Sequence, residues 1–187
     1  MRREIRFGGF GGQGIVTAGI ILARAAALHE NMNAVQTQSY GPEARGGASK
    51  SEVIISDSEI YYPKVKKPEI FVCMSQQALE KYFKDFSGIL IYDSSLIKNV
   101  SMEVKAYSIP ATMLAMKKLG KTIFANIIML GALVETTKII GREALKSAVL
   151  ESVPRGTEDL NMKALKIGFE EGKKALEIKN GNSRKDC

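Results

Sequence analysis

Five glycines fall within residues 8–14, between an extended apolar start and a long pattern rich in alanine, isoleucine and leucine. Three of them, Gly9, Gly11 and Gly14, have the spacing G-x-G-x-x-G, which permits a tight turn, close approach of backbone to a ligand, and close packing of helix on strand. The N–H groups that open the next helix favour an anion or a carbonyl oxygen. This loop is therefore a candidate binding site, formed by Gly9, Gly11, Gly12, Gln13 and Gly14.

The same spacing also occurs where a strand-to-helix turn uses glycine only for its backbone freedom, so a structural role stays open. A dinucleotide site needs an acidic residue about 20 positions further on, to hold a ribose hydroxyl. Here the second expected strand ends in Ser39 and Tyr40, and the nearest acids are Glu30 before it and Glu43 after it. A nicotinamide cofactor is not expected.

A second loop, residues 39–49, contains a proline and three glycines that interrupt regular structure. The guanidinium of Arg45 matches a carboxylate or a phosphate, and neighbouring glycines let the backbone come close to a ligand. The alternative is that Arg45 pairs with Glu43 or with a neighbouring subunit. The candidate binding residues in and just after this loop are Tyr40, Arg45, Gly46, Gly47 and Lys50.

Other side chains offer little chemistry. The only histidine, His29, is expected at a helix end on the surface, and Asp93 follows a strand where a turn would also use aspartate. Cys73 and Cys187 lie in unrelated settings, so we expect no disulfide, no structural zinc and no iron–sulfur cluster held by this chain alone. No catalytic residue is assigned.

Length and composition indicate one domain over residues 1–178, followed by a mobile polar tail at 179–187. Hydrophobic residues make up 45% of the chain and charged residues 25%, and no apolar run is long enough to cross a membrane. A cytoplasmic protein is expected. The net charge of +7 fits a solvated basic surface, an acidic protein partner or a phosphate-bearing ligand, and no nucleic-acid-binding module accompanies it.

Hydrophobic periodicity predicts an α/β order of elements. Strands are expected at residues 4–7, 34–38, 53–56, 60–62, 70–74, 88–92 and 104–109. Helices are expected at residues 15–30, 76–83, 110–120, 123–138, 142–152 and 159–177. The first two strands should form a parallel pair and 53–62 a hairpin, giving a three-layer α/β/α, Rossmann-like domain with a mostly parallel, mixed central sheet. Both glycine-containing loops should then meet at one sheet edge.

Together the motifs resemble a known family. Gly-Phe-Gly-Gly-Gln-Gly at 9–14, Ser-Tyr-Gly-Pro-Glu-Ala-Arg-Gly-Gly at 39–47 and Ser-Glu-Val-Ile-Ile-Ser at 51–56 are similar to the gamma subunit of the 2-oxoacid:ferredoxin oxidoreductases, which corresponds to domain III of pyruvate-ferredoxin oxidoreductase. The resemblance continues through Tyr62-Pro63 and the helix containing residues 125–131, and covers most of residues 4–160. The second motif, with the Ala-Ser-Lys-Ser-Glu that follows it, is most similar to the 2-oxoglutarate enzymes.

The resemblance implies a multisubunit enzyme that converts a 2-oxoacid and coenzyme A to an acyl-CoA and carbon dioxide while it reduces ferredoxin or flavodoxin. Thiamine diphosphate, magnesium and iron–sulfur clusters would belong to alpha, beta and delta-type subunits. This chain would be a wall of the active site, with Arg45 and Lys50 near the phosphates of coenzyme A. A free-standing nucleotide-binding or regulatory module, or a purely structural assembly subunit, remains the alternative.

Overall fold

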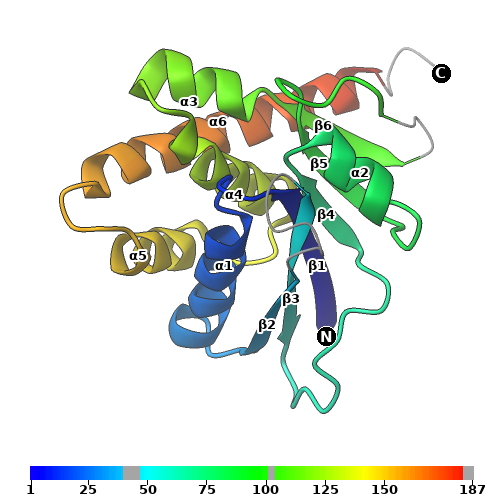
Figure 1. Ribbon diagram of the computed structural model, residues 1–187. Helices are drawn as coiled ribbons and strands as arrows, with labels where there is room; N and C mark the ends of the chain where they lie inside the picture. Colours follow the sequence, from blue (N-terminus) through cyan, green and yellow to red (C-terminus); the bar gives the residue numbers. More distant parts are fainter. Residues whose placement is uncertain (40–46, 101–103, 183–187) are drawn as a thin grey trace.

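A six-stranded mixed sheet forms the centre of the protein. The computed structural model describes residues 1–39, 47–100 and 104–182 (Figure 1). The strand order is β2-β3-β1-β4-β5-β6. Three of the five pairings are parallel, β1 with β4, β4 with β5 and β5 with β6, and β3 is antiparallel to both β1 and β2. The strands are β1 (Arg2–Phe10), β2 (Asn33–Ser39), β3 (Ala48–Ser56), β4 (Ile70–Cys73), β5 (Ile89–Asp93) and β6 (Lys105–Ile109).

Helices cover both faces of the sheet, but unequally. One face carries α1, α4 and, at the β6 edge, α6, with α3 and α5 outside them, and the opposite face carries α2 (Figure 1). The helices are α1 (Ile15–His29), α2 (Gln76–Tyr82), α3 (Ala111–Leu119), the short 3-10 turn η1 (Thr122–Phe124), α4 (Ala125–Thr137), α5 (Arg142–Ser152) and α6 (Glu158–Asn182). The predicted α/β architecture with a mostly parallel, mixed sheet is confirmed.

Local signals explain several element boundaries. The Ser75 hydroxyl accepts a hydrogen bond from the Ala78 N–H at 3.2 Å and so caps α2. Pro110 precedes α3, and Gly120 ends that helix in the left-handed conformation with φ +75°. Each boundary therefore follows from a single residue, through a side-chain cap at Ser75 and through backbone conformation at Pro110 and Gly120.

Two strand predictions were wrong. Residues 60–62 form no strand, so the predicted hairpin does not exist. Instead β3 is a nine-residue strand inserted between β1 and β2, which therefore do not pair with each other. Because β3 is antiparallel to both neighbours, β1 and β2 still point the same way. Their carboxyl ends, and the amino end of β3, lie at one edge of the sheet.

The C-terminal helix is longer than the pattern predicted. It continues to Asn182, so residues 179–182 are helical rather than part of a polar tail, and residues 183–187 lie outside the described range. The first half of α6 packs closely on α4 through glycines. A Cβ atom at Gly168 would lie 2.2 Å from the Ile128 carbonyl oxygen, and one at Gly131 would lie 2.6 Å from the Leu165 carbonyl oxygen. The two backbones thus touch where no side chain separates them.

Candidate functional site

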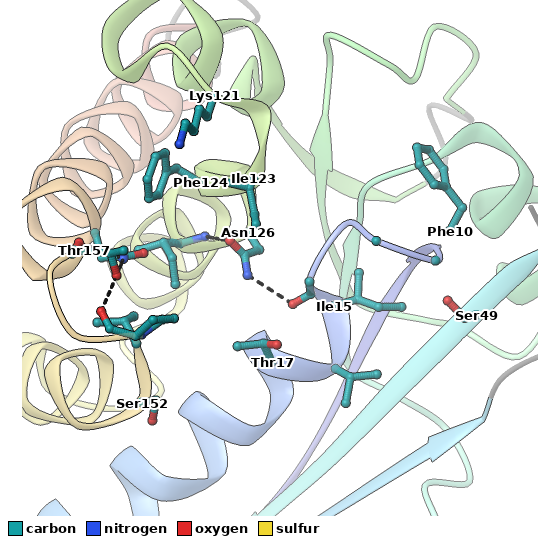
Figure 2. A pocket seen from close by; sticks show the side chains of 18 residues that line it. Phe10, Ile15, Thr17, Ser49, Lys121, Ile123, Phe124, Asn126, Ser152 and Thr157 are labelled. Carbon is teal, nitrogen blue, oxygen red and sulfur yellow. Dashed lines mark hydrogen bonds between the residues drawn. The ribbon is translucent and has the colours of Figure 1, made fainter.

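The glycine loop between β1 and α1 lines a pocket of about 600 Å³ at the carboxyl edge of the parallel strands. Three segments form its walls: the loop with the first turn of α1, the segment from Lys121 through the start of α4, and the connection from α5 to α6 (Figure 2). Gly11, Gly12 and Gly14 lie in the first wall. This is the crevice in which open α/β sheets bind ligands.

Glycine is needed at two positions of the loop. Gly12 has φ +92° and Gly14 has φ +74°, values that other residues rarely adopt. The amide of Gln13 fixes the turn from inside, because its oxygen accepts the Phe10 N–H at 2.9 Å and its nitrogen donates to the Met74 carbonyl at 2.7 Å. Gln13 therefore positions the loop on β4 and does not itself line the pocket.

Asn126 holds the loop from the other side. Its side-chain nitrogen donates to the Gly14 carbonyl at 3.2 Å, and its oxygen accepts the Ile127 N–H at 2.9 Å (Figure 2). A Cβ atom at Gly14 would come within 2.4 Å of that nitrogen, so side chain and glycine are matched in shape. Sequence reasoning missed Asn126 as a site residue. The available signal was an amide side chain at the start of the apolar helix that contains Gly131.

Neutral polar groups complete the walls. Ser49 donates to the Gly9 carbonyl at 3.3 Å, and Asn161 donates to the carbonyl and hydroxyl oxygens of Thr157. The Ser152 hydroxyl is buried and meets no hydrogen-bond partner within the described part of the chain. Lys121 is the only ionisable side chain among the described residues that line the pocket. Such walls can bind and orient a ligand, but they offer no acid–base pair.

The second predicted loop lies largely outside the described residues. Its predicted site residues Tyr40, Arg45 and Gly46 belong to the part that is not described. The strands on either side of it are described. Ser39 at the end of β2 pairs with Lys50, and Ala48 at the start of β3 pairs with Phe10 at the end of β1. The segment that leaves β2 and returns as β3 thus begins and ends at the sheet edge that carries the glycine loop. Gly47, just before β3, does not line the pocket.

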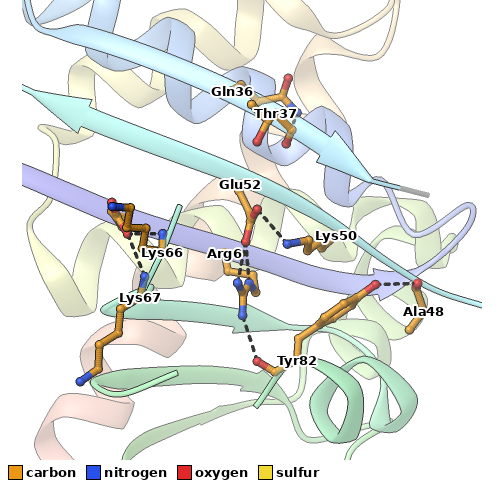
Figure 3. Close-up of polar contacts among 10 residues, drawn as sticks. Arg6, Gln36, Thr37, Ala48, Lys50, Glu52, Lys66, Lys67 and Tyr82 are labelled. Carbon is orange, nitrogen blue, oxygen red and sulfur yellow. Dashed lines mark hydrogen bonds and ion pairs between the residues drawn. The ribbon is translucent and has the colours of Figure 1, made fainter. Parts of the chain in front are cut away.

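Lys50 lies on the other face of the sheet from the pocket. Its ammonium contacts Glu52 at 2.9 Å and lies over the Tyr82 ring at 5.9 Å, on the side covered by α2 (Figure 3). Glu52 also accepts Arg6 Nε at 2.8 Å, and Arg6 donates to the Tyr82 carbonyl at 3.0 Å. The Lys50 cation is therefore part of a largely buried ion cluster and is not grouped with the glycine loop. Alternation of side chains along β3 is the reason, because Ser49 and Lys50 point to opposite faces.

The remaining candidates have structural roles. Asp93 is fully buried and accepts hydrogen bonds from the Ser95 N–H and from both the N–H and hydroxyl of Thr112, so it ties the end of β5 to the start of α3. His29, at the end of α1, lies 3.3 Å from a carboxylate oxygen of Glu151. Cys73 is buried, and burial raises the pKa of its thiol to about 12.

Across 1–39, 47–100 and 104–182, no three His, Cys, Asp or Glu side chains gather into a group that could hold a metal ion. None of the helices in this part of the chain has the length and apolar character needed to span a lipid bilayer.

Fold and site together define a class: an α/β domain whose carboxyl-edge pocket is walled by glycine backbone and neutral polar side chains. The chain belongs to the pyruvate ferredoxin/flavodoxin oxidoreductase family, whose model matches residues 4–171. The family expected from the two glycine-containing motifs is thereby confirmed.

Relatives of the chain include subunits of named oxidoreductases. It is 54% identical to the 2-oxoglutarate synthase subunit KorC of Methanocaldococcus jannaschii, over 92% of this chain and 95% of that protein. It is 50% identical to the subunit of the same name from Methanothermobacter thermautotrophicus, over 91% of this chain and 95% of that protein. Among solved structures, the gamma subunit of a keto/oxoacid ferredoxin oxidoreductase from Geobacter sulfurreducens superposes with a TM-score of 0.86 at 41% identity, covering 94% of this chain and 98% of that one.

Proposed function

We propose that this chain is the gamma subunit of a 2-oxoglutarate oxidoreductase and forms one wall of its active site. The family and the relatives named as 2-oxoglutarate synthase subunits, about half identical over nearly the whole chain, support this assignment. The overall reaction converts 2-oxoglutarate and coenzyme A to succinyl-CoA and carbon dioxide, and the electrons reduce ferredoxin or flavodoxin. The complex is assigned to the cytoplasm.

The composition of the pocket lining supports the proposed separation of roles between this chain and its companion subunits. The pocket opens at the sheet edge, and Lys121 is the only ionisable group among the described residues that line it. A wall of this composition orients a substrate and excludes water, while the reacting groups come from elsewhere. Companion alpha, beta and delta-type subunits would hold thiamine diphosphate, magnesium and iron–sulfur clusters, because the described residues provide no ligand group for a metal. When bound, thiamine diphosphate supplies the carbanion chemistry of decarboxylation.

Coenzyme A is the ligand we assign to this wall. Its acyl-carrying arm contains amides on an apolar chain, which suits a pocket with Ser49, Asn126 and Asn161 among apolar side chains. Its phosphates need cations, and we assign these contacts to Lys121 and to Arg45, the latter from its motif alone. Lys50 is left out because its ammonium is engaged by Glu52 on the opposite face of the sheet.

The test uses the complex reconstituted from this chain and its companion subunits. Arg45→Ala and Lys121→Ala should each raise the Michaelis constant for coenzyme A, by roughly tenfold for a lost phosphate contact, with little change in kcat. Lys50→Ala is the matched control, since it also removes one cation and should leave that constant within about twofold. Equal effects of all three substitutions, or effects on assembly alone, would contradict the assignment to coenzyme A.

A second measurement addresses the role of the whole chain. Companion subunits without it should lose coenzyme A-dependent reduction of the acceptor by 2-oxoglutarate, and adding it back should restore the rate. Decarboxylation and acceptor reduction at full rate in its absence would refute the active-site role. Faster turnover of pyruvate than of 2-oxoglutarate would refute the substrate assignment.

A further inference from the structure

An exposed apolar patch lies on α3 and η1, beside the glycine-loop pocket. Met113, Met116 and Ile123 are 51%, 57% and 62% exposed, although each is a large hydrophobic residue. The two methionines are three residues apart and share the outward face of α3, which lies at the periphery of the molecule (Figure 1). The inward face of that helix carries Leu114 and Ala115. We call Met113, Met116 and Ile123 the rim patch.

The rim patch adjoins the pocket. Ile123 lines the pocket together with Lys121 and Phe124 (Figure 2), and because it is still largely exposed, it lies at the pocket mouth. On the glycine loop, Phe10 lines the same pocket and is 39% exposed. A protein surface that covered Ile123 and Phe10 would therefore also close the pocket.

Unpaired cations accompany the rim patch. Lys117, Lys118 and Lys121 are exposed, and none of them forms an ion pair or hydrogen bond with a described residue. Residues 104–134 contain no aspartate or glutamate, so this stretch of the chain offers them no carboxylate. The end of a helix favours lysine, which accounts for Lys117 and Lys118 but not for the exposed methionines beside them. The surface thus combines exposed apolar area with positive charge that is unpaired among the described residues.

We propose that the rim patch, with Lys117 and Lys118, is the docking surface for an acidic and apolar face of a companion subunit, which closes the pocket when it binds. The proposal rests on the function proposed above. Charge complementarity identifies the occupant, since carboxylates of the partner would meet two cations that have no counter-charge within this chain's described residues. Methionine side chains adapt to irregular surfaces and are common at the centre of interfaces.

A second copy of this chain fits the surface less well. In a two-fold dimer the same patch lies on both sides of the interface, so Lys117 and Lys118 of one copy would face the same cations of the other. Like charges placed opposite each other oppose association. A small anion also fits less well, because it would neutralise the lysines and leave Met113 and Met116 in water.

The experiment measures binding of the full-length chain to its companion subunits by isothermal titration calorimetry, without coenzyme A. Lys117→Glu combined with Lys118→Glu should raise the Kd at least about tenfold at low salt, and added salt should reduce the difference. Met116→Ser keeps the charge and should raise the Kd at least about threefold at low and at high salt. The matched control combines Lys64→Glu and Lys67→Glu, exposed positions between β3 and β4 at the other sheet edge, and should change the Kd less than about twofold.

Three results would overturn the proposal. The first is an equal loss of binding in the two double variants, or unchanged binding in either rim variant. The second is self-association of the isolated chain that Met116→Ser abolishes, which would indicate a second copy as occupant. The third is unchanged assembly with a raised Michaelis constant for coenzyme A in the lysine variant, which would indicate a ligand site.

Failure of this proposal is distinguishable from failure of the proposed function. Assembly is measured here without coenzyme A, whereas the coenzyme A contacts are tested by the Michaelis constants of Arg45→Ala and Lys121→Ala, which lie outside the altered positions. Circular dichroism of each variant confirms that it is folded, and glutamine variants at the same lysines replace any that is not.

Discussion

The match between Gly14 and Asn126 gives a prediction that can be worked out from the structure. Gly14→Ala introduces a Cβ atom at a backbone with φ +74°, 2.4 Å from the side-chain nitrogen of Asn126. Two separate costs follow. One is backbone strain in the left-handed region, and the other is displacement of an amide whose hydrogen bond to the Gly14 carbonyl is 3.2 Å long.

The two costs have different sizes and can be separated. Left-handed strain amounts to about 1–2 kcal/mol, and a buried amide that loses its partner costs about 1–3 kcal/mol, so Gly14→Ala should lower the free energy of unfolding by about 2–5 kcal/mol. Asn126→Ala alone should cost about 1–2 kcal/mol, since the Gly14 carbonyl keeps the Ala18 N–H at 2.9 Å. In the double variant the clash is absent. Its destabilisation should therefore be smaller than the sum of the single effects by about 1–3 kcal/mol.

Urea unfolding of the full chain, followed by circular dichroism, measures each free energy of unfolding. Gly12→Ala controls for strain alone, because Gly12 has φ +92° and a Cβ atom there would meet nothing within 4 Å. A Cβ atom at Gly11 would also meet nothing within 4 Å, and Gly11 has no positive φ. Gly11→Ala should therefore change the free energy of unfolding by less than about 0.5 kcal/mol. Additive effects of Gly14→Ala and Asn126→Ala, to within about 0.5 kcal/mol, would refute the proposed steric match.

Three further predictions concern stability. Gly168→Ala should lower the midpoint of urea unfolding, because overpacking against α4 costs about 1–3 kcal/mol and the gain in helix propensity is about 1 kcal/mol. An unchanged or raised midpoint would contradict the close contact between the two helices. Glu52→Gln should destabilise the chain by about 3–5 kcal/mol in the same assay, by leaving the buried Arg6 without its counter-charge, and Arg6→Met in that background should recover part of the loss. Burial opposes ionisation of Glu135, but Lys138 and Arg142 outweigh it and lower the pKa of its carboxyl below 4.5. Its contribution to stability is thus present above pH 4.5 and is lost as the pH falls through the lower folded-state pKa. The free energy of unfolding should therefore fall less steeply between pH 6 and pH 3 in Glu135→Gln than in the unaltered chain.

Much of the fold was predictable because local signals were strong. The cap at Ser75, the proline before α3 and the left-handed Gly120 each set a helix boundary through one residue. The buried strands β4 and β5 read as continuous apolar runs, as expected for strands covered on both faces. The pairing of the strands could not be predicted from local sequence patterns in the same way. A nine-residue antiparallel β3 between β1 and β2 depends on contacts far apart in sequence, which no local pattern specifies.

The site was predicted in part for the same reason. Glycines in a strand-to-helix turn indicate a binding loop, and three of the five named there line the pocket. Lys50 was grouped with the second loop, residues 39–49, because it directly follows that loop in the sequence, whereas the pleat of β3 places its side chain on the face of the sheet opposite the pocket. Asn126 is 112 residues from Gly14 along the chain, and only packing of α4 beside α1 brings the two together.

The sequence by itself determined the family, the α/β class and the backbone freedom of the glycine loop, because each of these depends on residue types at short spacing. The tertiary structure alone decided which side chains share a space. In the folded chain, Asp93 is buried and its hydrogen bonds join β5 to α3, and Lys50 pairs with Glu52. Residues from the α5–α6 connection form the remaining wall of the pocket. Such groupings depend on strand order, on alternation across the sheet and on helix packing, all of which are set by contacts between distant segments of the chain.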